Sequence, residues 1–309
     1  RSVHPISFEL FPAIAWPRAL QHYLDICWAR RSRCSDNHNS NHGSVETRTV
    51  KIGLSTSSVF PESTAAAFEL AALTGFEGVE IMVGMDSMSQ DSTVLRNLVQ
   101  HYQLPILSLH APCLLVTQRV WGTDSWGKLE KAREVAELVG AETVVVHPPF
   151  RWQRDYAKNF EAGIAELNAN SPVGFTVENM YPWRAGPGSF PAYSPDWDIR
   201  NQDYENVTLD FSHTAVSQTD PLDMIREFGN RLKHIHLADG TDSASDEHLV
   251  PGRGTQPVRE GLEALKDQGF NGSIVAEIST RSVADRGERI ADLQASIEFV
   301  RAVFPIGER

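Results

Sequence analysis

Cysteine is scarce in this sequence, and its scarcity argues against two kinds of architecture. The chain has three cysteines, Cys27, Cys34 and Cys113, which make an odd number without any CxxC spacing. This pattern predicts neither a disulfide framework nor a thiolate zinc site, and it is typical of a protein in a reducing cytoplasm. The N-terminus also lacks the basic-then-apolar pattern of a signal peptide. We therefore expect a cytoplasmic protein.

Long apolar segments and an excess of positive charge are absent as well. No apolar run approaches the roughly 18 to 20 residues of a membrane-spanning helix, so we expect no membrane association. The formal net charge of −12 argues mildly against a large nucleic-acid-binding face, although a local basic groove stays open. The chain of 309 residues, 41% hydrophobic and 22% charged, has the composition of a globular protein and the length of one large domain.

The first 49 residues differ from everything that follows. Residues 30–49 are polar and rich in turn-forming residues, and no periodicity runs through them. Such composition is typical of a linker or a disordered segment. Residues 20–31 have the pattern of a short amphipathic helix. We predict that residues 1–49 form an extension outside the fold and that residues 50–309 form a single catalytic domain.

From Val50 onward, short apolar runs alternate with helical patterns. Most runs are continuously apolar, as expected for parallel strands that are covered on both faces. The runs occupy residues 50–55, 78–83, 105–110, 143–148, 174–179, 207–212, 232–237 and 273–278. Eight such strands, each with an intervening or following helix, predict the α/β class and a closed (β/α)8 TIM barrel.

Two of the intervening segments show clear helical periodicity. Apolar residues recur on one face over residues 129–139, and Gly140 follows as a stop signal. A second pattern covers residues 290–304 at the end of the chain. The alternative to a barrel is an open doubly wound sheet, but no GxGxxG or GxxxxGK[ST] follows the first strand.

Ionisable residues gather at the C-terminal ends of the predicted strands. They are His110, His147, Glu178, Asp210 with His213 beyond it, His234 and His236 with Asp239 beyond them, and Glu277. In a parallel barrel these ends open onto one face, where active sites are built. Side chains far apart in sequence are therefore expected to meet in one small space.

A bound cation would explain why so many carboxylates are placed together. A single histidine or carboxylate at a strand end is often structural, but like charges that share a low-dielectric site cannot all stay ionised. Mixed carboxylate and imidazole ligands without thiolate suit Mn, Mg, Co, Zn or Fe. We predict a divalent-metal site, and the identity of the metal stays open.

The loop after the seventh predicted strand carries further candidates. Asp246 and His248 are spaced to place two ligating groups on one turn. The glycines of the PGRG sequence allow a close backbone approach to a ligand, and Arg253 between them is a candidate to bind a phosphate or carboxylate of the substrate. A flexible polar loop without function is the alternative.

Seven short motifs occur in the order of a known superfamily: SLHAP, VVVHPP, FTVEN, LDFSH, HIHLADG, DEHLVPGRG and VAEIS. With these motifs, the region from about Val50 to Phe304 resembles the xylose isomerase-like TIM barrel superfamily. That superfamily includes sugar and sugar-phosphate isomerases and epimerases, and also endonuclease IV. The motifs are more specific for the superfamily than for one of its members.

In the isomerase and epimerase branch, the resemblance implies one divalent ion held by Glu178, Asp210, His236 and Glu277. It further implies that Glu178 and Glu277 act as acid and base on either side of an enediolate, and that His213 contacts the substrate. The expected substrate is a small molecule, namely a sugar, a sugar phosphate or a ketone derived from a polyol. Carbohydrate metabolism is the expected context.

The endonuclease IV branch implies a different chemistry, the cleavage of a phosphodiester at an abasic site with three zinc ions. Its ligand set adds five residues to the four above, and this chain has the required type at each: His110, His147, His213, Asp246 and His248. Two departures favour the isomerase branch. Cys113 and Leu114 follow the HAP sequence where the nucleases carry an aromatic wedge, and the loop after His236 is shorter than theirs.

A third hypothesis is a barrel that holds metal and binds a sugar without turning it over. The sequence leaves open which sugar is bound, whether one or three ions bind, and the oligomeric state, with a homo-oligomer among the alternatives.

Overall fold

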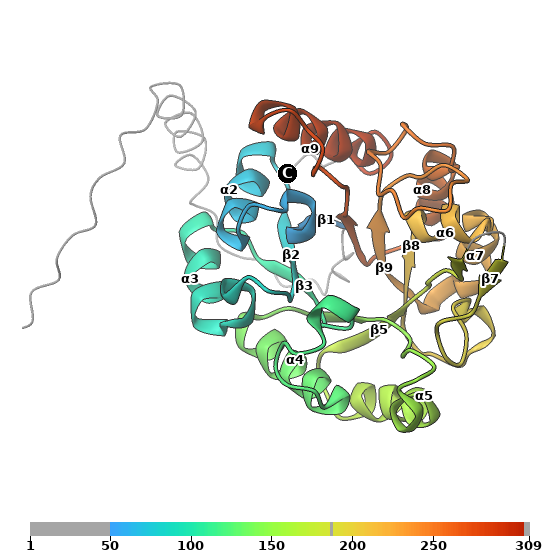
Figure 1. Ribbon diagram of the computed structural model, residues 1–309. Helices are drawn as coiled ribbons and strands as arrows, with labels where there is room; N and C mark the ends of the chain where they lie inside the picture. The colour runs from blue at the N-terminus through green and yellow to red at the C-terminus, as the bar shows by residue number, and fades with distance from the viewer. Residues whose placement is uncertain (1–49, 186–187, 306–309) are drawn as a thin grey trace, which may run out of the picture. The chain divides into compact units, whose positions relative to one another are not determined.

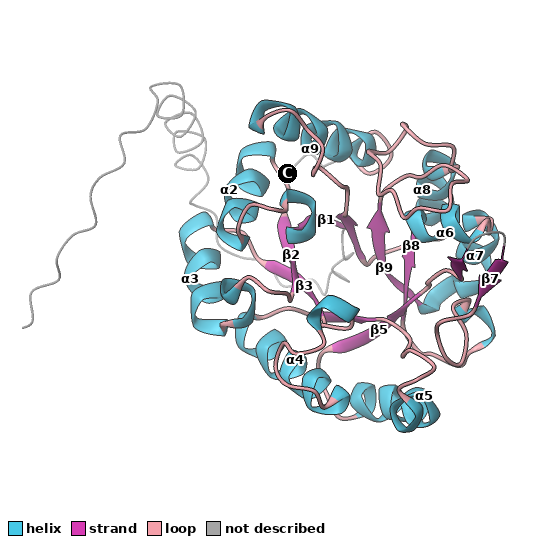
Figure 2. Cartoon of the chain, viewed as in Figure 1, coloured by secondary structure: helices cyan, strands magenta, loops and turns pink. Residues whose placement is uncertain are grey.

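A barrel of eight parallel strands forms the centre of the protein. The structure, a computed structural model, describes residues 50–185 and 188–305. The barrel closes in the order β1-β10-β9-β8-β5-β4-β3-β2, with the strands inside a ring of helices (Figures 1 and 2). The strands are β1 (Lys51–Ser55), β2 (Gly78–Met82), β3 (Ile106–His110), β4 (Thr143–Val146), β5 (Gly174–Glu178), β8 (Val207–Asp210), β9 (Leu232–Leu237) and β10 (Ser273–Ala276). The predicted TIM barrel is confirmed, and the open sheet is wrong.

The apolar runs form strands because both of their faces are covered. In β3 every residue is buried, and its register pairs Leu109 with Val144 of β4 in parallel. One face packs against the barrel interior and the other against the helical layer, so no alternation of polar residues is needed. Each of the eight predicted runs contains one barrel strand.

Eight helices lie in the described part of the chain. They are α2 (Thr64–Thr74), α3 (Ser92–Tyr102), α4 (Ser125–Val139), α5 (Arg154–Ala169), α6 (Phe211–Ser217), α7 (Pro221–Phe228), α8 (Val258–Asp267) and α9 (Arg286–Arg301). Helix α4 ends as predicted, since Gly140 adopts a left-handed conformation with φ 77°. Helix α9 ends at Arg301, so Phe304 packs against the core from beyond the helix and not from its last turn.

One helix of the predicted pattern is not present. The described residues between β5 and β8 contain no α-helix; they form the antiparallel pair β6 (Trp183–Ala185) and β7 (Gly188–Phe190) and the 3₁₀-helix η4 (Ile199–Asn201). Prolines at positions 182, 191 and 195 interrupt any helical hydrogen-bond pattern in this segment. Helices α6 and α7 both follow β8 instead. The expectation of one helix for every strand is therefore wrong at these two positions.

A polar layer crosses the barrel interior beneath the strand ends. It is built from five fully buried side chains: Glu80, Ser108, Thr176, Thr208 and His234. The Nε2 atom of His234 lies 2.9 Å from Oε2 of Glu80, and because β2 and β9 are not neighbours this contact spans the interior. The Thr208 hydroxyl donates to Oγ1 of Thr176 at 2.8 Å.

The predicted extension, with Cys27 and Cys34, lies outside the described residues, so its boundary with the barrel stays a prediction. Among the helices that the structure describes, none combines the length and the apolar character that crossing a membrane requires.

Candidate metal centre

The C-terminal ends of the barrel strands surround a cavity of about 730 Å³. Eight of the residues predicted from the sequence line it: His110, His147, Glu178, Asp210, His213, Asp246, His248 and Glu277. His236 is fully buried beside them. The barrel topology therefore brings together side chains that are separated by up to 167 positions, from residue 110 to residue 277.

Four ligand-type side chains from four strands converge at one point. The Nδ1 atom of His236 lies 3.1 Å from Oε1 of Glu178 and 3.0 Å from Oε2 of Glu277. The same nitrogen lies 3.6 Å from Oδ2 of Asp210. Because both glutamate oxygens approach one atom, they lie no further apart than the sum of these two short distances. Glu178, His236 and Glu277 therefore form one cluster of ligand-type side chains.

The backbone around Asp210 holds that carboxylate in place. Its Oδ1 accepts a hydrogen bond from the backbone N–H of His213 at 3.0 Å, so Asp210 caps the first turn of α6. The side chain of Asn179 joins the ends of β5 and β8, since its Oδ1 accepts from Asp210 N at 2.7 Å and its Nδ2 donates to Asp210 O at 3.2 Å. Asp210 and Glu178 are therefore fixed relative to each other.

The donor set and one unsatisfied atom fit a divalent cation. Oδ2 of Asp210 is buried and has no hydrogen-bond partner among the described residues, which is costly for a carboxylate oxygen. Ligand atoms of Asp210, Glu178 and His236 lie within 4.8 Å of one another, and Glu277 contacts this group through Nδ1 of His236. Oxygen and imidazole ligands without thiolate suit Mg, Mn, Co or Zn.

Two further groups of side chains adjoin the first. His110 Nε2 and His147 Nε2 lie 3.2 Å and 3.0 Å from Oε2 of Glu178, the oxygen that does not contact His236. On the other side, His213 Nε2 and His248 Nε2 approach Oδ2 of Asp246 at 3.3 Å and 3.1 Å. His110, His147 and Glu178 form one group whose ligand atoms lie within 4.8 Å of one another. Asp210, His213 and His248 form a second such group.

Mutual attraction between carboxylates and imidazoles shifts the acidities of these groups. Burial alone would lower the pKa of His236, but the negative charges of Glu277, Glu80 and Glu178 outweigh it and hold this pKa well above the usual range. Burial likewise opposes ionisation of Glu277, yet His236 brings the pKa of Glu277 down to about 2. The negative charge of these carboxylates must be balanced by positive charge, either from protons on the histidines or from a bound cation.

Comparison with known proteins decides the family. The family described as "Xylose isomerase-like TIM barrel" matches residues 68–303. The chain belongs to the xylose isomerase-like TIM barrel family.

Relatives within this family include an uncharacterized protein of Mycobacterium tuberculosis, 47% identical over 271 residues, which cover 82% of this chain and 97% of the relative. D-psicose 3-epimerase of Enterocloster bolteae is 32% identical over 116 residues, 32% of this chain and 36% of the enzyme. Among solved structures, D-allulose 3-epimerase of Methylomonas sp. in complex with D-allulose has the same fold, with a TM-score of 0.60 and 17% identity over 83% of this chain and 98% of that one.

Within this xylose isomerase-like barrel, the loop after β9 is organised by Asp239. Its Oδ1 accepts from the backbone N–H groups of Gly240 at 2.8 Å and Gln256 at 3.1 Å. Its Oδ2 accepts from Gly252 at 2.9 Å and Gly254 at 3.0 Å. A side chain at Gly254 would collide with the Asp239 carboxylate, since a Cβ there would overlap Oδ1. The glycines of the loop therefore allow close approach to Asp239.

The structure places Arg253 away from the other candidates. Its guanidinium forms an ion pair with Asp292 of α9, 2.5 Å from Oδ1, and it does not line the cavity. Among the described residues that line the cavity, Arg281 is the only lysine or arginine. Arg281 stacks on Phe60, with the guanidinium carbon 4.5 Å from the ring centroid. Arg281 was not among the residues predicted from the sequence.

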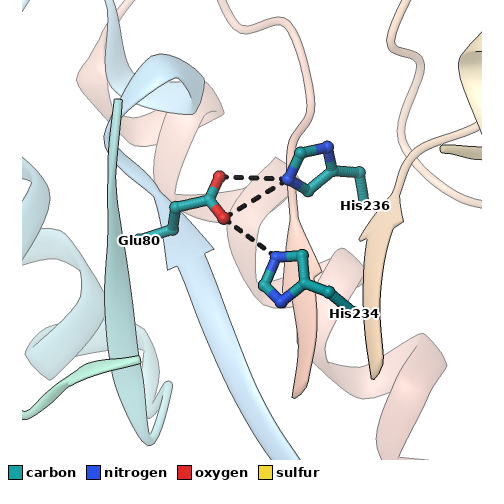
Figure 3. Close-up of side chains that lie close together, drawn as sticks. All are labelled: Glu80, His234 and His236. Atoms are coloured by element: carbon teal, nitrogen blue, oxygen red, sulfur yellow. Dashed lines mark hydrogen bonds and ion pairs between the residues drawn. The ribbon is translucent and has the colours of Figure 1, made fainter. Parts of the chain in front are cut away.

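Glu80 is a second residue that the sequence analysis missed. It lies in the middle of β2, is fully buried, and contacts His234 and His236 from across the barrel (Figure 3). Burial would raise its pKa, but the charge of His236 and the hydrogen bonds of both histidines hold the pKa of Glu80 well below the usual range. The sequence does contain one signal for Glu80, because it is a lone carboxylate inside an otherwise apolar strand.

Proposed function

We propose that this protein is a divalent-metal-dependent isomerase or epimerase of a sugar, a sugar phosphate or a polyol-derived ketone. The observation that carries the proposal is the convergence of Glu178 Oε1 and Glu277 Oε2 on Nδ1 of His236, at 3.1 Å and 3.0 Å. Two carboxylates that face one cavity from different strands can remove a proton from a single substrate and return one to it.

In this proposal Glu178, Asp210, His236 and Glu277 hold the ion. When bound, the cation polarises the carbonyl and hydroxyl oxygens of the substrate and stabilises the negative charge of an enediolate. The relatives described above support the epimerase or isomerase class, because D-psicose 3-epimerase resembles part of the chain and D-allulose 3-epimerase has the same fold.

Glu178 and Glu277 are the proposed acid and base. One carboxylate removes the proton on the carbon next to the substrate carbonyl. The other delivers a proton to the opposite face of the same carbon, which inverts it, or to the neighbouring carbon, which moves the carbonyl. Each is oriented by a contact outside the central group: the Ser57 hydroxyl donates to Oε1 of Glu277 at 3.0 Å, and His147 Nε2 lies 3.0 Å from Oε2 of Glu178. These contacts leave one oxygen of each carboxylate directed toward the central group.

Arg281 is the proposed contact for an anionic substituent of the substrate. It is exposed, it lies at the cavity, and within the described residues it has no carboxylate partner at ion-pair distance. A phosphate or carboxylate on the sugar would meet it by a charge-assisted hydrogen bond. Arg253, which the sequence suggested for this role, is already paired with Asp292.

Solvent deuterium exchange tests the proposal. The protein, supplied with Mn²⁺ or Co²⁺, is incubated in D₂O with a panel of ketoses, ketose phosphates and keto-inositols, and incorporation is followed by NMR. We expect exchange next to the carbonyl of at least one substrate, lost in Glu178→Gln and Glu277→Gln. Glu77→Gln, on the turn before β2 and outside the cavity, is the matched control and should exchange normally. Metal binding without exchange in any substrate would contradict the proposal and favour a sugar-binding barrel.

The two groups beside the central one support a second candidate, a phosphodiesterase of the endonuclease IV kind. His110, His147 and Glu178 form one possible ion site, and Asp210, His213 and His248 form another. Elemental analysis of the purified protein separates the candidates, because three zinc ions per chain would favour the phosphodiesterase and one ion the isomerase. Cleavage of a duplex with an abasic site, abolished by chelator and by Glu178→Gln, would establish the second candidate.

A further inference from the structure

We propose that Glu80 is a positioning residue that holds the proton of His236 on Nε2 and so leaves Nδ1 free to bind a cation. The inference rests on the proposed function, because it concerns His236 as a metal ligand. Glu80 lies on β2, on the far side of the barrel interior from His236 on β9 (Figure 3). It does not line the cavity, and no strand-end motif includes it.

The two nitrogens of His236 point at two different sets of carboxylates. Nδ1 faces Glu178 and Glu277 at 3.1 Å and 3.0 Å, as described above. Nε2 lies 3.2 Å from Oε1 and 3.3 Å from Oε2 of Glu80. A neutral imidazole has one N–H and one lone pair, so only one of these nitrogens can donate while the other binds a cation.

Carboxylates lie beside both ring nitrogens of His236, so a cation held by Glu178, Asp210 and Glu277 would take the lone pair of Nδ1 and leave the proton on Nε2, where the Glu80 carboxylate accepts it. With Glu80 beside Nε2, the proton of neutral His236 resides on Nε2 and the lone pair of Nδ1 is directed at Glu178, Asp210 and Glu277. A carboxylate behind a ligating histidine also raises the basicity of the ligand and fixes the ring orientation. The ligand geometry at the cavity thus depends on a residue one layer deeper.

The environment of Glu80 is built to keep its carboxylate in this position. The Ser108 hydroxyl donates to Oε2 at 2.7 Å, and Nε2 of His234 lies 2.9 Å from the same oxygen. His234 and His236 are two positions apart on β9, so their side chains share one face of the strand. Ser108 and His234 therefore hold Glu80 from β3 and β9, and Glu80 in turn holds His236.

A second metal ion at Glu80, His234 and His236 is the competing explanation, since their ligand atoms also lie within 4.8 Å of one another. Oε1 of Glu80 and Nδ1 of His234 have no hydrogen-bond partner among the described residues, but the contacts of Oε2 and the depth of the group favour hydrogen bonding over a second ion. Oε2 of Glu80 already accepts from Ser108, and the three residues are fully buried beneath the cavity, away from its lining. An ion bound there would also require His236 to give up both ring protons, because Nδ1 serves the cavity.

Cobalt binding by full-length Glu80→Gln tests the inference. The amide keeps the shape of the side chain but offers a single acceptor and adds a donor, so it no longer selects one tautomer. We expect the affinity for Co²⁺, measured by titration calorimetry, to fall by roughly 10- to 100-fold. The number of ions per chain should stay unchanged, and the visible absorption bands of the Co²⁺ form should shift. Glu80→Asp, which keeps the charge, should recover part of the affinity.

Two further variants serve as a control and as a replacement for Glu80→Gln. Glu77→Gln removes a carboxylate at the opposite end of β2, where Glu77 accepts from the backbone N–H of Ile52 at 2.9 Å, and it should leave Co²⁺ affinity and spectrum unchanged. If Glu80→Gln does not fold, Ser108→Ala carries the test, and it should weaken Co²⁺ binding by a few-fold while the carboxylate remains.

Three outcomes would overturn the inference, and they differ from one another. Wild-type Co²⁺ affinity and spectrum in a folded Glu80→Gln or Ser108→Ala variant would show that Glu80 only stabilises the core. Loss of one ion from a larger number would show that Glu80 is itself a ligand. Wild-type protein that binds no Co²⁺ would remove the proposed function together with this inference, whereas the first two results leave that function intact.

Discussion

Asp210→Asn separates metal binding from folding more cleanly than any other change at the site. Oδ1 of Asp210 caps α6 through the N–H of His213, and Asn is as good a cap as Asp because its side-chain oxygen accepts the same bond. Oδ2 has no hydrogen-bond partner among the described residues, and its ion-pair contacts, with Nδ1 of His236 at 3.6 Å and Nδ1 of His213 at 4.0 Å, lie within the site and not in the supporting fold. The substitution therefore removes a proposed ligand and keeps the helix.

The expected effect can be expressed as a shift in melting temperature. Loss of a residue that merely supports a ligand costs about 10- to 100-fold in metal affinity, so loss of the ligand should cost about 100-fold or more. At a metal concentration about 100 times the wild-type Kd, binding stabilises the wild type by about 2.7 kcal/mol and the variant by about 0.4 kcal/mol. For a domain of this size the difference corresponds to roughly 5 °C.

Thermal unfolding followed by circular dichroism, with Mn²⁺ and after chelation, measures this shift. Asp220→Asn is the matched control, because Asp220 caps the neighbouring helix α7 through the N–H of Leu222 at 2.8 Å and lies outside the cavity. The control should keep the full metal-induced shift. An equal shift in Asp210→Asn would refute the assignment of Asp210 as a ligand. A large drop in the melting temperature of the chelated variant would refute the claim that its carboxylate charge is dispensable for folding.

Three further predictions concern other parts of the domain. Arg281→Gln should raise KM for a sugar phosphate about 10-fold and leave KM for a neutral sugar unchanged in steady-state assays, since only an anion needs the guanidinium; equal effects on both would refute the role. Asp239→Asn should lower the free energy of unfolding by about 3 kcal/mol in urea titrations, because two of its four backbone donors would then face an amide N–H₂; unchanged stability would contradict this. Burial raises the pKa of the Cys113 thiol to about 11, so its alkylation at pH 8, followed by peptide mass mapping, should be about 100-fold slower than that of a thiol with the ordinary pKa. The folded protein keeps a proton that the unfolded chain releases above about pH 9, so the stability that Cys113 contributes should fall as pH rises from 9 to 11; alkylation at the rate of a free thiol would contradict the shift.

The strands, and the polar side chains that meet at the mouth of the barrel, were predictable because both are encoded locally. A parallel strand covered on both faces must be a continuous apolar run, and a polar residue that ends such a run lies at the mouth of the barrel. Glu178 and Asp210 follow this rule directly, as the last residues of β5 and β8. The helix that is missing between β5 and β8 was not predictable from the rhythm of the chain, since that segment pairs with itself instead.

The errors arose where a residue's partner lies far away in the sequence. Arg253 has the surroundings of an anion-binding residue, but its partner Asp292 is 39 positions later, on the face of α9. Glu80 has an apolar neighbour on each side, and only the closure of the barrel brings it to His234 and His236, more than 150 positions away. Hydrophobic periodicity contains no information about which strands face each other across an interior.

The anchoring of the β9 loop by Asp239 has a consequence for how this fold can change its substrate. The Asp239 carboxylate accepts from backbone N–H groups at both ends of the loop, so the two ends stay in place when residues 242–245 at the tip are replaced. Within that stretch Asp242, Ser243 and Ser245 are exposed or half-buried. Variation in the length and chemistry of this tip could therefore retune what the barrel accepts without disturbing the strand that carries His236.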